Sequence, residues 1–130
     1  MIKELMNYLG IAFPEGVYLG NAPENMKPPY LTVEEGGTDY DDGLTPDAAR
    51  SRMGNYTVAV FAEDYASLSA LLERLRLRVD RVGEVFELWG LHIGLMKIES
   101  EEQTQSYYLE DGETLVFERD INIVIHYERI

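Results

Sequence analysis

The segment from Gly54 to Val82 constrains the fold of this chain more than any other. It begins with the run GNYTVAVFAE, in which apolar and polar residues alternate, and continues directly into the amphipathic run ALLERLRLRV. Alternation with a period of two predicts a half-buried strand, and apolar residues three and four positions apart predict a helix. Glu63 or Asp64 can cap that helix. Because the strand passes straight into the helix, no catalytic loop fits between them, and the segment indicates a scaffold.

Residues before this unit predict one helix and two strands. Apolar side chains at positions 2, 5, 6 and 9 have the spacing of a short amphipathic helix, and Gly10 is a suitable stop. A short strand is expected at Val17–Leu19 and a second at Tyr30–Glu35. After the central helix, the run Val85–Ile98 predicts a strand or two, with a bulge or close backbone approach at its glycines.

The clearest strand pattern lies near the end of the chain, where residues 115–127 carry apolar side chains at most odd positions and polar ones at most even positions. Fully extended, the strand from Thr114 to Tyr127 would span nearly 50 Å at about 3.4 Å per residue, so it must bend or project. Arg119 interrupts the apolar face between Phe117 and Ile121. This interruption predicts either a bulge or a sheet edge that meets another subunit.

The order of helix, strands, helix, strands predicts an α+β domain. We expect a mainly antiparallel sheet of about four to five strands, with two helices packed on one face. The whole chain, residues 1–130, is expected to form one domain. Residues 36–53 lack a core pattern and predict a mobile loop, because the segment is too polar to bury and too long for a simple turn.

Composition narrows the classes of partner. The chain has 24 acidic residues against 11 Lys and Arg, and its formal net charge is −13. A field of that sign repels nucleic-acid phosphates and anionic membrane surfaces, so we expect neither specific nucleic-acid binding nor a membrane partner. The absence of cysteine suits a reducing compartment such as the cytoplasm.

No motif in the sequence supplies a nucleophile, a phosphate cradle or a metal cluster, so we expect no enzyme activity, no catalytic residue, no cofactor and no metal. Asp39, Asp41 and Asp42 resemble a calcium loop, since hard cations bind several carboxylate oxygens. The EF-hand spacing is not met, because Gly43 comes one place early and residue 49 is alanine. A solvated acidic loop and an ordered calcium site both remain open, and the spacing favours the first.

Basic side chains gather on the central helix. Arg74, Arg78 and Arg81 are spaced by four and three residues and form one stripe, whereas Arg76 points elsewhere. The stripe is either a solvated face paired with nearby acids or a contact with the acids of a neighbouring subunit, which guanidinium groups recognise in a fork-like geometry. The candidate subunit-interface residues are therefore Arg74, Arg78, Arg81, Asp39, Asp41, Asp42 and Arg119.

Three segments carry a family resemblance: PYLTVEEGG, YTVAVFAEDYASLSALLERL and LEDGETLVFERDINIVIHYE. In this order they resemble the tail terminator and minor capsid (head–tail joining) proteins of long-tailed bacteriophages. The shared layout is an extended strand ending near Gly-Gly, a strand entering a helix through an acidic-aromatic step, and a long closing strand. The chain departs from the family where Ala62 or Glu63 stands in place of an arginine, and where Glu113 stands in place of a basic residue.

The resemblance implies a structural subunit of a phage or prophage particle, assembled in the bacterial cytoplasm and located at the head-proximal end of the tail. It implies a homo-oligomeric ring, commonly a hexamer, that caps the tail tube and allows head attachment. Tail-tube and head-completion proteins would be its partners, and DNA could pass through an acidic lumen without sticking. The alternative is a cytoplasmic acidic protein-binding module, which could act as a nucleic-acid mimic.

Overall fold

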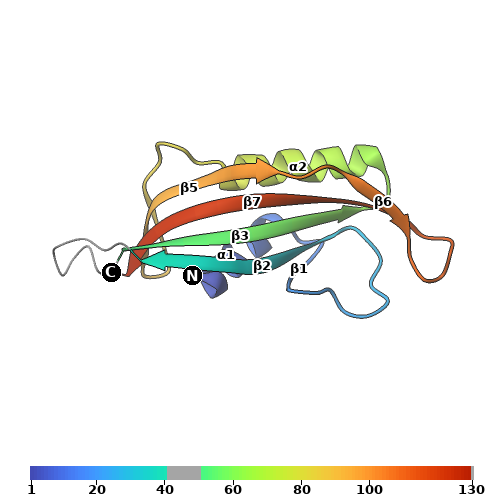
Figure 1. Ribbon diagram of the computed structural model, residues 1–130, viewed down its shortest axis with the longest axis horizontal. Helices are drawn as coiled ribbons and strands as arrows, with labels where there is room; N and C mark the ends of the chain where they lie inside the picture. Colours follow the sequence, from blue (N-terminus) through green and yellow to red (C-terminus); the bar gives the residue numbers. More distant parts are fainter. Residues whose placement is uncertain (41–50, 130) are drawn as a thin grey trace.

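The computed structural model describes residues 1–40 and 51–129, which form two helices and one large sheet (Figure 1). The elements follow in the order α1 (Ile2–Ala12), β1 (Val17–Leu19), β2 (Tyr30–Tyr40), β3 (Ser51–Ala62), α2 (Tyr65–Val79), β4 (Phe86–Leu88), β5 (Leu91–Glu101), β6 (Gln105–Tyr108) and β7 (Leu115–Arg129). Asp64 caps α2, because its carboxylate accepts a hydrogen bond of 2.7 Å from the backbone N–H of Ser67. This cap sits at the predicted step from strand to helix.

The predicted fold class is wrong in the number of strands and in the type of sheet. The part of the chain that the structure describes forms a seven-stranded sheet in the order β1-β2-β3-β7-β5-β4, and β6 pairs with β7 beyond this path. The sheet is mixed, because β1 pairs parallel with β2 while the other neighbours pair antiparallel. Figure 1 shows the long strands β5, β7, β3 and β2 side by side in a sheet that curls along its length.

Strand β7 is the axis of the sheet. Along one side it pairs with β3 over the whole run from Phe117 to Glu128, without a register shift. Along its other side it pairs first with β6 and then with β5. Arg119 lies where these two partners change, so its place in the apolar pattern marks a switch of neighbour instead of a bulge against β3.

The core lies on one face of the sheet. The buried face includes alternate residues of β3 and β7, such as Val58 and Ile123, each at most 1% exposed. The same cluster holds Leu5 and Leu9 of α1 and Leu75 of α2, so both helices pack against one core. Because the helices cover this face, the alternate residues of the same strands point to the opposite face.

The ends of the predicted loop at 36–53 belong to strands. Residues 38–40 of β2 pair with residues 52–54 of β3, after a register shift between Glu35 and Thr38. Extra residues at a shift of this kind form a β-bulge. The bulge interrupts the alternating pattern at the Gly-Gly pair, which explains why the sequence predicted a strand only as far as Glu35. Residues 41–50 lie outside the described residues. The bulge expected at the glycines of β5 is confirmed at Gly94, where the register against β7 shifts.

Candidate functional site

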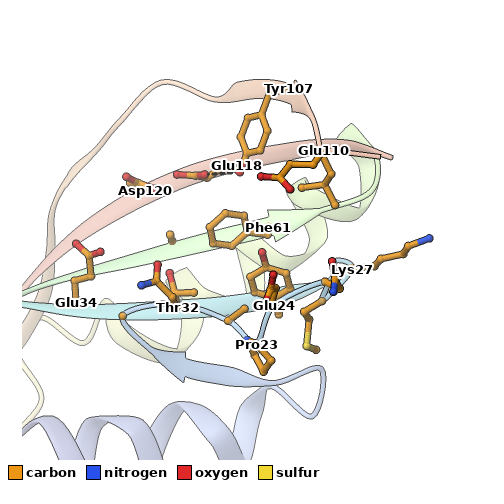
Figure 2. Close-up of a pocket in the computed structure, with 18 of the residues that line it drawn as sticks. Pro23, Glu24, Lys27, Thr32, Glu34, Phe61, Tyr107, Glu110, Glu118 and Asp120 are labelled. Atoms are coloured by element: carbon orange, nitrogen blue, oxygen red, sulfur yellow. Dashed lines mark hydrogen bonds between the residues drawn. The ribbon is translucent and has the colours of Figure 1, made fainter. Parts of the chain in front are cut away.

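A groove of about 770 Å³ lies on the face of the sheet opposite the core (Figure 2). Its floor consists of residues from β2, β3 and β7, which point away from the helices. One wall is the loop from Gly20 to Lys27, and the other is formed by Tyr107 and the turn that follows β6. The sites expected from the sequence did not include this groove.

The strand register brings the floor residues together in rows. Ala59 of β3 lies between Thr32 of β2 and Asp120 of β7, to which it is paired directly on either side. One row along the strands, Phe61 lies between Tyr30 and Glu118 in the same way. Because alanine has the smallest side chain in these rows, the floor is hollow at Ala59 and rises on either side of it.

Aromatic rings form one end of the hollow. Tyr30 and Phe61 stack with their ring centroids 4.6 Å apart, and Tyr18 meets Tyr30 edge-on at 6.1 Å. On the opposite wall, the hydroxyl of Tyr107 donates a hydrogen bond of 2.8 Å to a carboxylate oxygen of Glu118. The aromatic faces therefore lie beside carboxylates, an arrangement that favours cations over anions.

Asp120 is the least satisfied group in the groove. Its Oδ1 atom is buried and has no hydrogen-bond partner in the described part of the chain. Burial, together with the neighbouring carboxylate of Glu118, raises the pKa of Asp120 from 3.8 to about 6. Burial and Glu118 also raise the pKa of the Tyr107 phenol, so its hydroxyl keeps the proton that it donates to Glu118.

The groove carries a strong negative charge. Six of its lining residues are acidic, against one lysine; the acids are Glu24, Glu34, Glu110, Asp111, Glu118 and Asp120. Lys27 points away from the hollow (Figure 2). None of the six carboxylates forms an ion pair with another described residue. Asp111 is tied into its own turn, where hydrogen bonds from Thr114 and Glu113 lower its pKa to about 2.

The arginine stripe predicted on the central helix makes contacts within the chain. Arg74 pairs with Glu15 at 2.8 Å. Arg78 donates to the backbone carbonyl of Tyr8, and Arg81 donates to the hydroxyl of the same tyrosine. These contacts join α1 to α2 and its following loop. A contact of the stripe with another subunit stays a prediction, and Arg74, with 42% of its side chain exposed, is the most available.

The remaining interface candidates lie in two places. The guanidinium Nε of Arg119 is 3.5 Å from Glu101 Oε1, close enough for attraction between the charges but without a hydrogen bond. Asp39 pairs with Met53 through the backbone of the β2–β3 ladder, whereas Asp41 and Asp42 lie outside the described residues. The calcium reading of these three aspartates is therefore untested.

Within residues 1–40 and 51–129, no three His, Cys, Asp or Glu side chains cluster so that they could hold a metal ion. Neither helix has the length and apolar character needed to cross a membrane.

Comparisons with known proteins find a similar fold among solved structures. No protein-family model matches the chain, and no curated protein has significant sequence similarity to it. A chain in the solved structure of the virion of a native gene transfer agent (GTA) particle superposes on it with a TM-score of 0.56 at 14% identity. The superposition covers 92% of this chain and 84% of the GTA chain. The chain has the fold of a virion protein.

The sequence held only a weak signal for the groove. Thr32, Ala59 and Asp120 are polar or small at positions that alternate with core residues, so the pattern places them on the face opposite the core. It does not show that the loop at 20–27 and the turn after β6 wall that face. That arrangement depends on pairings between segments far apart in the sequence.

Proposed function

We propose that this chain is a structural subunit of a phage-like particle, encoded by a phage or prophage. The observation that carries the proposal is the match of its fold to a GTA virion protein over 92% of the chain. At 14% identity the match supports the architecture alone. The role of the chain in the particle is the part that we propose. Such a subunit works through complementary surfaces, without catalysis.

Within the virion, the role of tail terminator or head–tail joining protein fits best. In this role the chain forms a ring, commonly a hexamer, on the head-proximal end of the tail tube, stops its growth and receives the head. The three segments that resemble the tail terminator family fall on elements that build the sheet. The first runs along β2 to its bulge, the second spans β3 and α2, and the third covers the β6–β7 turn and β7.

The two edge strands of the sheet support assembly with further copies of the chain. Strands β1 and β4 are the two edges of the main path of the sheet, and edge strands leave backbone groups free to bind another chain. Exposed apolar side chains flank them: Leu19 is 59% exposed at β1, and Val85 and Trp89 are 62% and 56% exposed at β4. Exposed apolar side chains near an unpaired edge favour a protein interface. The two edges differ, so head-to-tail contacts would close a ring.

Deleting the gene from a strain that produces the particles tests the proposed role. If the chain terminates the tail, electron micrographs of the deletion strain will show heads and tails unjoined and tails of unregulated length. Expression of the intact chain from a plasmid should restore joined particles. Normal particles from the deletion strain would reject a virion role, and joined particles with altered heads would move the role to the capsid.

A second function, an acidic protein-binding module, is favoured by the groove, whose six carboxylates form no ion pair with a described residue. The two functions differ in what they require of the purified chain. A module binds a basic protein as a monomer, whereas a terminator associates with its own copies or with the tail tube. Light scattering of the isolated chain, with and without purified tail tubes, separates them.

A further inference from the structure

We propose that the groove on the helix-free face binds a basic segment of a partner protein, with one arginine or lysine side chain seated in the hollow over Ala59. This inference concerns a surface that the ring proposal does not use. It therefore stands or fails independently of the virion role.

The hollow has the width of one side chain. Thr32 and Asp120 lie on either side of Ala59 in directly paired positions. Because neighbouring strands are about 4.8 Å apart, the backbones of these two residues are separated by roughly 10 Å. Phe61 lies further along the same strand and closes one end of the hollow. An extended side chain fits between these walls, and the rest of the groove leaves room for the segment that carries it.

Two polar groups face the hollow without a partner. Asp120 Oδ1 is buried and accepts no hydrogen bond from a described residue. Thr32 is only 6% exposed and lines the groove, yet its hydroxyl has no hydrogen bond to another part of the described chain. A buried polar atom normally has a partner, so the unpaired Asp120 Oδ1 points to a ligand. The Thr32 hydroxyl is not itself a buried unpaired atom, but it lines the same groove and is free to bond to that ligand. That ligand must donate hydrogen bonds, because a carboxylate only accepts them.

Charge and aromatic rings specify a cation. The groove has six acids that form no ion pair with a described residue, and its one lysine points away (Figure 2). The stacked rings of Tyr30 and Phe61 offer a face on which a guanidinium or ammonium group is favoured. An arginine or lysine side chain satisfies the carboxylate, the hydroxyl and the rings together. The groove length, from Gly20 to Asp111 across three strands, suits an extended peptide better than a small amine.

Fluorescence anisotropy with a labelled peptide of alternating glycine and arginine tests the proposal at low and at physiological salt. A peptide with citrulline in place of arginine keeps the shape and hydrogen-bonding groups but removes the charge. We expect the arginine peptide to bind the isolated chain and the citrulline peptide to show no binding at the same concentrations. Amide chemical shifts should change at residues 30–34, 57–61 and 118–120.

Variants separate the hollow from the overall negative charge. Asp120→Asn removes the unpaired carboxylate and keeps its shape, and we expect binding to weaken about tenfold, the usual effect of losing one charge-assisted hydrogen bond. Glu99→Gln, at an exposed position outside the groove, changes the net charge equally and should alter binding less than about twofold. Thr32→Val should weaken binding by a smaller factor, because it removes only a neutral hydroxyl.

Several outcomes overturn the proposal. Equal weakening by Asp120→Asn and Glu99→Gln would reduce the binding to general charge attraction. Competition by spermidine as strong as that of the peptide would make the groove a polyamine site. Dissociation of self-associated chains by the peptide would make a second copy the occupant. If Asp120→Asn does not fold, Ala59→Leu replaces it: this variant fills the hollow, leaves every charge in place and should abolish binding.

Discussion

Arg78 and Tyr8 bind each other in both directions. The Tyr8 hydroxyl donates a hydrogen bond of 2.8 Å to the backbone carbonyl of Arg78, and the Arg78 guanidinium donates two, of 3.2 and 2.8 Å, to the backbone carbonyl of Tyr8. The guanidinium carbon also lies 3.7 Å from the centroid of the Tyr8 ring. Arg81 adds a hydrogen bond to the same hydroxyl. This pair fastens α1 to the last turn of α2, beside the core that both helices share.

Tyr8→Phe should lower the free energy of unfolding by about 1–3 kcal/mol, because it removes the acceptor for Arg81 and leaves the carbonyl of Arg78 without its donor. Tyr18→Phe is the matched control, since its hydroxyl reaches only the sulfur of Met26 at 3.3 Å, a weak acceptor. Urea denaturation measures both variants. Equal losses would mean that the Tyr8 hydroxyl has no special part in joining the helices.

The two faces of β7 predict opposite responses to substitution. Ile123 is 1% exposed within the core, so Ile123→Asp buries a carboxylate without a partner and should cost several kcal/mol, of the order of the stability of a domain. His126 is exposed, and His126→Ala should cost under about 1 kcal/mol. Denaturant midpoints measure the difference. A larger loss for His126→Ala than for Ile123→Asp would contradict the assignment of the faces.

Local rules account for the elements that the sequence predicted correctly. The cap at Asp64 needs only a carboxylate one position before the helix, and the bulge at Gly94 needs only a residue without a side chain in a strand. The glycine at position 54 is likewise explained by a near neighbour, because a Cβ there would lie 2.5 Å from the hydroxyl oxygen of the buried Tyr56. Each of these features is decided within a few residues of the chain.

Features that depend on distant partners could not be predicted. The parallel pairing of Val17 with Leu31, which makes the sheet mixed, depends on a connection whose direction no periodicity encodes. The arginine stripe was predicted as a stripe, but the residue that it meets, Tyr8, lies 70 positions from Arg78. The groove arises likewise, because the register alone sets Asp120 beside Ala59.

The pH dependence of the free energy of unfolding should reveal the raised pKa of Asp120. Its pKa in the folded chain is about 6, above the ordinary value of 3.8, because burial and the adjacent Glu118 disfavour the charged form. The folded state therefore holds this proton more tightly, and the resulting stability is present below pH 3.8 and is lost as the pH rises through 6. Asp120→Asn, which is never charged, should be more stable than the parent at pH 8 by about 1–2 kcal/mol, allowing for partial exposure to solvent.

At pH 4 the Asp120→Asn variant and the parent should have nearly the same stability, since the parent is then largely protonated as well. Urea denaturation at both pH values gives the comparison, with Glu99→Gln as the control for charge removal elsewhere. Tyr107 donates to Glu118 throughout this range, because its phenol pKa is raised. A constant difference between Asp120→Asn and the parent at both pH values would show that Asp120 does not titrate abnormally.

Trp89 can report directly on assembly at the β4 edge, because it is the only tryptophan of the chain and is 56% exposed. If β4 meets another copy, Trp89 loses water contact, and its emission should shift to shorter wavelength as the protein concentration rises. Val85→Glu places a charge at this edge and should keep the emission at long wavelength and the chain monomeric in light scattering. Leu77→Glu, at a side chain that is 77% exposed on α2, is the matched control and should leave association unchanged. Oligomers that form without any shift in Trp89 emission would place the subunit interface away from β4.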